Sequence, residues 1–225
     1  MNIREFDDRG KLMSDLAVAV AADLDAKIKQ QGWASLAVPG GTTPGPFFDA
    51  LSETDLDWAN VSISLGDERF VPETSDRSNT ALIKARLLQN KAADANLIRL
   101  YKEAQNPEDV LDELEAPFKS VLPLSVNVLG MGADMHTASL FPDSAELEGA
   151  LNTDRILSVV RPDSQPEARL TLSGKVLAGA DHIYILITGE EKRKALEQAA
   201  RIADPLIAPI SLVLDLPQTT VFYAE

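Results

Sequence analysis

Short apolar runs alternate with longer segments of helical periodicity along the whole chain of 225 residues. In the longest helical segment Leu12, Leu16, Val20, Leu24 and Ile28 recur every four residues. Strands that alternate with helices at this spacing connect through right-handed crossovers into a mostly parallel sheet with helices on both faces. The sequence therefore predicts an α/β fold: one domain, residues 1–225, with a doubly wound sheet.

Periodicity and the turn residues at the ends of each segment predict the individual elements. The predicted strands are Asn2–Phe6, Ala34–Val38, Val61–Leu65, Leu97–Leu100, Val126–Leu129, Ile156–Val160, Ile183–Ile187 and Thr219–Tyr223. The predicted helices are Lys11–Gln31, a helix that carries Phe47, Phe48 and Leu51, and then Asn79–Gln89, Pro107–Lys119 and Glu190–Ile202.

Four loops with unusual residues each come directly after a predicted strand. PGGTT follows Val38, GDER follows Leu65, GMGADMH follows Leu129, and TGEEK follows Ile187. In open α/β sheets the carboxyl ends of the strands share one edge, and ligands bind there at the point where the connections change direction. We expect the four loops to meet at one site.

The composition excludes several classes of partner and site. The formal net charge of −14 repels polyanions, which argues against nucleic acid or an anionic membrane as the partner. The chain has no cysteine and only two histidines, so disulfides, thiolate nucleophiles and a metal site are not predicted. The N-terminal MNIREFDDRG lacks the features of a secretory signal, and we expect a cytoplasmic protein.

The stretch VLGMGADMHTASLFP contains one of the two histidines, His136, two residues after Asp134. Imidazole is the side chain that ordinarily titrates close to neutral pH, so a histidine in a glycine turn beside a carboxylate is a candidate general base. The alternative is a histidine that only hydrogen-bonds to the loop backbone. The other histidine, His182, begins a predicted strand and is interpreted as structural.

The other three loops each allow two interpretations. The PGGTT loop is either a phosphate cradle at a helix N-terminus or a plain turn. The GDER triplet is either a solvated charge run or a strand end from which Arg69 reaches an anion. Lys192 lies in the first turn of its helix, where the helix dipole disfavours a cation unless an anion binds nearby. GMGADM lacks the third glycine of a dinucleotide fingerprint, which argues against NAD.

Together these motifs resemble one known family. PGGTTP, LGDERFVP with SNTAL, VLGMGADMHTASLFP and ITGEEKRKAL occur in this order through most of the chain and resemble the 6-phosphogluconolactonase family. The resemblance implies hydrolysis of 6-phospho-D-glucono-1,5-lactone, a small-molecule sugar-phosphate lactone, to 6-phosphogluconate in the oxidative pentose phosphate pathway. It also implies that no cofactor is needed and that the fold is related to that of sugar-phosphate isomerases.

The resemblance further implies roles for single residues. His136 matches the general base, Asp134 its polar neighbour, and Arg69 a basic position of the substrate site. The remaining positions implied to bind substrate or its phosphate are Gly40, Gly41, Thr42, Thr43, Asp67, Asn79, Arg169 and Lys192. One position departs from the family pattern. The family usually has the motif DGH here, and this chain has Met135 in place of the glycine. We expect a left-handed turn that the fold tolerates, not a side chain that collides with substrate.

Two other functions stay open at this point. One is a glucosamine-6-phosphate deaminase or another sugar-phosphate isomerase, against which the TASLFP segment argues. The other is a domain that binds a sugar phosphate without turnover. Ser139 as a covalent nucleophile is disfavoured, because no third member of a catalytic triad is evident. The sequence indicates no particular oligomeric state.

Overall fold

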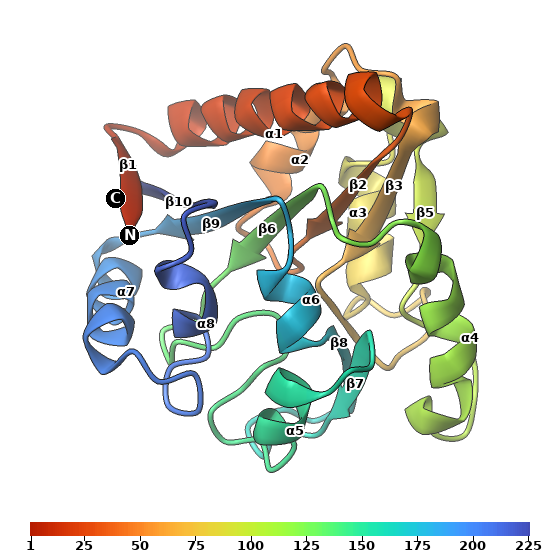
Figure 1. The fold of residues 1–225 in the computed structure, drawn as a ribbon, viewed down its shortest axis with the longest axis vertical. Helices are drawn as coiled ribbons and strands as arrows, with labels where there is room; N and C mark the ends of the chain where they lie inside the picture. Colours follow the sequence, from red (N-terminus) through yellow and green to blue (C-terminus); the bar gives the residue numbers. More distant parts are fainter.

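The computed structural model describes residues 1–225, and its centre is a seven-stranded sheet with the order β1-β10-β9-β6-β2-β3-β5 (Figure 1). All neighbouring strands in this sheet are parallel. The predicted doubly wound α/β fold is therefore confirmed. The strands of this sheet are β1 (Asn2–Phe6), β2 (Ala34–Val38), β3 (Val61–Leu65), β5 (Asn96–Ile98), β6 (Val126–Gly130), β9 (His182–Thr188) and β10 (Thr219–Ala224).

Helices lie on both sides of the sheet, with α1 and α2 on one side and α6, α7 and α8 on the other (Figure 1). The long helix α1 carries the chain from β1 at the sheet edge to β2. It begins where the Asp8 side chain accepts a hydrogen bond from the amide of Lys11, and it ends at Gly32, which has φ 87°. The helices are α1 (Arg9–Gln31), α2 (Gly45–Ser52), α3 (Asn79–Arg86), α4 (Leu111–Glu115), α5 (Leu147–Asn152), α6 (Gly174–Ala178), α7 (Glu190–Ile202) and α8 (Ser211–Leu214).

The strand order reverses between β2 and β6. After β2 the chain adds β3 and then β5 on one side, and it returns to the other side of β2 to form β6, followed by β9 and β10. The connections that follow β2 and β6 therefore run in opposite directions, which leaves a crevice between them at the carboxyl edge of the sheet. This reversal is the topological position at which open α/β sheets bind their ligands.

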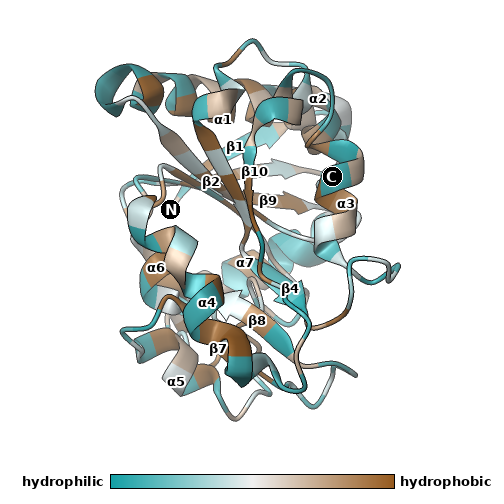
Figure 2. Cartoon of the chain, turned by 90° about the vertical axis from the view of Figure 1, so that its right-hand side faces the viewer, coloured by the Kyte–Doolittle hydropathy of each residue, from teal (hydrophilic) through white to brown (hydrophobic).

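A second, three-stranded antiparallel sheet was not predicted. It has the order β4-β8-β7, with β4 (Asp67–Arg69), β8 (Arg169–Leu172) and β7 (Leu157–Val160), and Figure 2 shows β4 and β8 together beyond the central sheet. The prediction that the segment at residues 156–160 joins the parallel sheet is wrong. Asp67–Arg69, which is predicted as a loop, forms a strand by pairing with β8. Local patterns do not predict this strand, because β8 lies far away in the sequence.

Several predicted boundaries also differ. The predicted helix from Asn79 to Gln89 ends at Arg86, and β5 is shorter than predicted. The predicted helix 107–119 divides into the 3-10 segment Pro107–Val110, α4 and the 3-10 segment Ala116–Ser120, which contains Pro117. Proline has no amide to donate and disrupts a continuous α-helix.

The apolar residues form one core cluster of 55 buried side chains between the sheet and its helices. In Figure 2 the strands β2 and β9 are largely brown, as expected of parallel strands that are covered on both faces. None of the helices combines the length and the hydropathy that crossing a membrane would require.

Candidate active site

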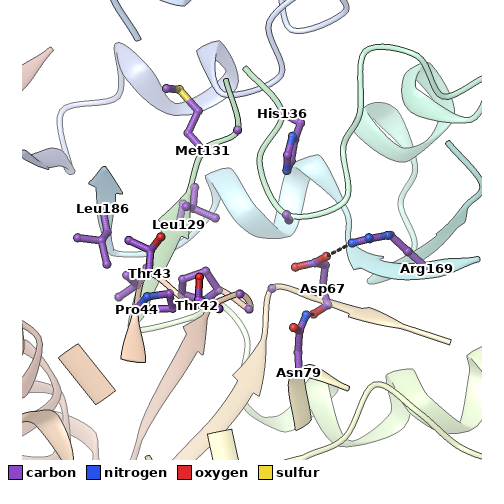
Figure 3. A pocket seen from close by; sticks show the side chains of 18 of the residues that line it. Thr42, Thr43, Pro44, Asp67, Asn79, Leu129, Met131, His136, Arg169 and Leu186 are labelled. Carbon is purple, nitrogen blue, oxygen red and sulfur yellow. Dashed lines mark hydrogen bonds and ion pairs between the residues drawn. The ribbon is translucent and has the colours of Figure 1, made fainter. Parts of the chain in front are cut away.

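The four polar loops meet at a cavity of about 210 Å³ at the carboxyl edge of the central sheet (Figure 3). The loop after β2 contributes Gly40, Gly41, Thr42 and Thr43, and the chain after β3 contributes Asp67 and Arg69. The loop after β6 contributes His136, and the start of α7 contributes Lys192. Asn79 and Arg169, from α3 and β8, complete the polar wall. The predicted convergence of the loops is therefore confirmed.

His136 and Asp134 form a hydrogen-bonded pair at this cavity. Nδ1 of the imidazole lies 2.5 Å from Oδ1 of the carboxylate, and no protein group bonds to Nε2. Burial raises the pKa of the Asp134 carboxyl, but the hydrogen bond and charge of His136 outweigh burial, so this pKa lies below its ordinary value. The carboxylate thus orients the imidazole and leaves its second nitrogen available to a ligand.

A tight turn creates this pair. The amide of Met135 donates to the carbonyl of Gly132 at 3.1 Å, and Met135 has φ 67°, the left-handed conformation expected from the sequence. A Cβ atom at Gly132 would lie 2.3 Å from Oδ1 of Asp134 and from Nδ1 of His136, so only glycine leaves room for the pair. Met135 is partly buried, packs against the core and does not line the cavity.

The glycine-rich loop presents amides that have no partner in the protein. None of the N–H groups of Gly40, Gly41, Thr42 and Thr43 donates to another protein group. Gly41 has φ 83°, and a Cβ atom at Gly40 would lie 2.2 Å from the side chain of Asn79. Both glycines are therefore required by the path of the loop, and free amides in such a loop suit an anionic oxygen.

Glu68 is a buried residue of the site region whose importance the sequence did not indicate. Its carboxylate is 0% exposed and accepts hydrogen bonds from the amides of Arg69, Asn79 and Thr80 at 2.7 to 2.8 Å. The Ser78 hydroxyl donates to the same carboxylate. The interpretation of the DER triplet as a solvated charge run is wrong for Glu68 and for Asp67, because both are buried. Glu68 joins β4 to the N-terminus of α3, where an anion is favourable.

Asp67 links three parts of the chain. Its Oδ2 atom accepts a hydrogen bond from the hydroxyl of Ser139 at 2.5 Å and lies 3.6 Å from a guanidinium nitrogen of Arg169, the contact dashed in Figure 3. Ser139 is 0% exposed, so its hydroxyl is bound to Asp67 and has no access to a ligand. Arg169 is 5% exposed; burial lowers its pKa, and the charge of Asp67 offsets this only in part.

Three cationic side chains line the cavity of this acidic protein: Arg69, Arg169 and Lys192. Arg69 donates to the backbone carbonyl of Arg77 at 2.5 Å, and its Nε atom is buried without a partner. Lys192 has no carboxylate within 4.0 Å, and burial lowers its pKa although the charges of Glu191 and Asp134 raise it. Cations held in this way attract an anionic ligand strongly.

Two other residues, His182 and Lys194 of the ITGEEKRKAL motif, lie outside this cavity. His182 lies 3.4 Å from the carboxylate of Asp23 and does not line the cavity, in agreement with its structural interpretation. Lys194 is exposed and pairs with Glu190. The cavity therefore combines one histidine–carboxylate pair with a cationic wall and free amides, an arrangement that can activate water next to a phosphorylated ligand.

Comparisons with known proteins agree with this arrangement. The model of the family "glucosamine-6-phosphate isomerases/6-phosphogluconolactonase" matches residues 7–222. A 6-phosphogluconolactonase of Mesorhizobium japonicum is 45% identical over 217 residues, which cover 95% of this chain and 90% of that protein.

Solved structures agree as well. The crystal structure of a 6-phosphogluconolactonase from Shewanella baltica superposes with a TM-score of 0.95 at 36% identity, covering 100% of this chain and 97% of the other. A monomeric glucosamine-6-phosphate deaminase superposes with a TM-score of 0.81 at 19% identity, over 100% and 98% of the two chains, and shows the fold alone. The chain belongs to the glucosamine-6-phosphate isomerase/6-phosphogluconolactonase family.

Proposed function

We propose that this protein hydrolyses 6-phospho-D-glucono-1,5-lactone to 6-phospho-D-gluconate, the second step of the oxidative pentose phosphate pathway. The observation that carries the proposal is the His136–Asp134 pair at a cavity that is also lined by three cationic side chains. The pair fits activation of water, and the cations fit a phosphate dianion. The relatives that share most of the chain are named for this activity.

In the proposed mechanism Nε2 of His136 takes a proton from a water molecule as its oxygen attacks the lactone carbonyl carbon. The carboxylate of Asp134 stabilises the imidazolium that forms. When the tetrahedral intermediate collapses, the bond to the ring oxygen breaks, and the imidazolium returns its proton to that oxygen. The product is the open-chain acid and His136 is neutral again. General acid–base catalysis of this kind contributes about 10²–10⁴-fold.

The charges that develop during the reaction match the cationic wall. The carbonyl oxygen becomes an oxyanion, and the substrate carries a phosphate dianion throughout. Arg69, Arg169, Lys192 and the amides of the glycine-rich loop supply the donors for both groups. Donors fixed by the fold stabilise developing charge without having to reorganise during the reaction.

The isomerase and deaminase alternative is not favoured. The similarity to the glucosamine-6-phosphate deaminase concerns the fold, whereas the relatives at 32 to 45% identity are 6-phosphogluconolactonases. A deaminase releases ammonia and a lactonase does not, so the two activities are separable in one preparation. The organisation as one domain and the cytoplasmic location remain predictions from the sequence.

The test compares substrates. The phosphorylated lactone is generated in situ from glucose 6-phosphate, and its disappearance is followed with and without the protein; gluconolactone without phosphate is measured in parallel. We expect strong acceleration for the phosphorylated lactone and a far smaller effect on the other. Equal efficiency on both lactones would reject the phosphate site, and ammonia release from glucosamine 6-phosphate without lactone hydrolysis would reject the activity.

A further inference from the structure

Phe141 contacts two functional side chains, those of His136 and Arg169. Its ring centroid is 4.2 Å from the imidazole centroid of His136, with 23° between the planes, and Cζ of the Arg169 guanidinium lies 5.4 Å from the same centroid. Phe141 is 2% exposed and does not line the cavity. We propose that Phe141 is a positioning residue, which fixes the orientation of the base His136 and of Arg169. The proposal rests on the proposed function.

The ring supplies a restraint that Asp134 does not. The hydrogen bond between Nδ1 of His136 and the accepting Oδ1 of Asp134 restrains one edge of the imidazole, but it does not block a swing of the ring out of its plane about the Cβ–Cγ bond. Stacking against Phe141 acts perpendicular to that plane and opposes the swing. With both restraints Nε2 keeps one direction, which a base requires before a water molecule can be deprotonated in the correct geometry.

The ring also offers its π face to positive charge. Arg169 is buried and its Nε atom has no hydrogen-bond partner, while its nearest carboxylate oxygen, on Asp67, is 3.6 Å away. A guanidinium over an aromatic ring is stabilised electrostatically, more so when it is desolvated. In the proposed mechanism His136 becomes an imidazolium, and this second cation is stabilised by the same ring.

The compact segment between His136 and Phe141 brings the two rings together. The hydroxyl of Thr137 donates to the carbonyl of Gly130 at 2.9 Å, and the amide of Leu140 donates to the carbonyl of Thr137 at 3.0 Å. Ala138 has φ 49°, which reverses the chain within this segment. This turn therefore places Phe141, five residues after His136, against the imidazole ring.

The experiment compares Phe141→Leu with Phe118→Leu. Phe118 is also fully buried, but it lies in the segment Ala116–Ser120 and contributes nothing to the cavity wall. Both variants lose an aromatic ring from the core, so both are expected to lower Tm by a similar amount. We expect Phe141→Leu to lower kcat about tenfold and to weaken 6-phosphogluconate binding, measured by calorimetry, about threefold. Phe118→Leu is expected to leave both within twofold.

A second comparison separates positioning from support of the fold. The same Phe141→Leu change is made in a His136→Ala protein, and the residual rate is measured at raised enzyme concentration. If the ring acts through His136, the tenfold effect on kcat falls below twofold in this background. An equal tenfold loss in both backgrounds, or an unchanged kcat in the single variant, would overturn the proposal.

Two controls keep the result unambiguous. Phe141→Met fills the same volume with a flexible side chain and replaces the leucine variant if that one does not fold; the same kinetic outcomes are expected, and a kcat within twofold of the parent contradicts the proposal. The unmodified protein is assayed in every series. A parent without lactonase activity would reject the proposed function, whereas an active parent with an unaffected Phe141 variant would reject only the positioning role.

Discussion

Asp134 and His136 are two residues apart, and their side chains meet through Oδ1 and Nδ1 at 2.5 Å. The left-handed conformation of Met135 between them and the missing Cβ atom of Gly132 make this contact possible. The pair therefore depends on the turn as well as on the two side chains. Substitutions in the turn and substitutions of the side chains can both test it.

Asp134→Asn is expected to lower kcat at least about tenfold, because an amide cannot stabilise the imidazolium or enforce the same tautomer. The measurement is kcat and kcat/KM between about pH 5 and about pH 9. A profile and kcat equal to those of the parent would show that the pair has no part in catalysis.

The titration of Asp134 itself does not interfere with this test. Its pKa is depressed below its ordinary value of 3.8, so the stability it contributes is present above that value and is lost only as the pH falls through the folded-state pKa. Across the range of the assay Asp134 stays ionised.

Lys192→Met is expected to raise KM for the phosphorylated lactone about tenfold or more, because a cation without a carboxylate partner is removed from the cavity. Lys194→Met is the matched control, since that lysine is exposed and pairs with Glu190. Burial lowers the pKa of Lys192, so substrate binding by the parent should weaken with rising pH before the ordinary lysine value of 10.5 is reached. Steady-state kinetics with both variants decides; equal KM values would exclude Lys192 from binding.

Glu68→Gln is expected to destabilise the protein by about 2 kcal/mol or more, because an amide nitrogen replaces an oxygen that accepts backbone hydrogen bonds in a fully buried position. Glu103→Gln, at an exposed position, should be close to neutral. Thermal and denaturant unfolding measure the difference. A Tm unchanged within about 2 °C would contradict the structural role assigned to Glu68.

Met135→Gly is expected to leave kcat/KM within about tenfold of the parent, a change below ~1.4 kcal/mol. Glycine adopts the left-handed conformation without strain, and the methionine side chain that is lost packs against the core outside the cavity. Kinetics of the purified variant provides the check. A gain of several orders of magnitude would mean that Met135 obstructs the site.

The central sheet, its order of helices and the convergence of four loops follow from local patterns, and the sequence predicts them well. Helix Glu190–Ile202 and strand Val61–Leu65 have the predicted bounds, because apolar periodicity marks both elements, Gly189 precedes the helix and Gly66 follows the strand. The left-handed conformation of Met135 is also predictable, since this position ordinarily takes glycine in the motif.

The antiparallel sheet and the contacts of Glu68, Ser139 and Phe141 could not be predicted in the same way. Strand β4 has three residues, all polar, and is a strand only because β8 pairs with it after a long separation. Three of the four residues that donate to Glu68 lie ten or more positions later in the sequence, and Phe141 meets Arg169, which lies on β8. Contacts between distant segments leave no local periodicity.

The role of His136 as the general base is tested most directly by the rate at which 6-phospho-D-glucono-1,5-lactone, generated in situ, disappears in the presence of His136→Ala and of His182→Ala. The protein has only these two histidines, and His182 lies beside Asp23 outside the cavity, so it is the matched control. We expect a kcat at least about 10²-fold below the parent for His136→Ala, with 6-phosphogluconate binding retained, and parental kinetics for His182→Ala. A folded His136→Ala protein with near-parental turnover would exclude His136 as the general base.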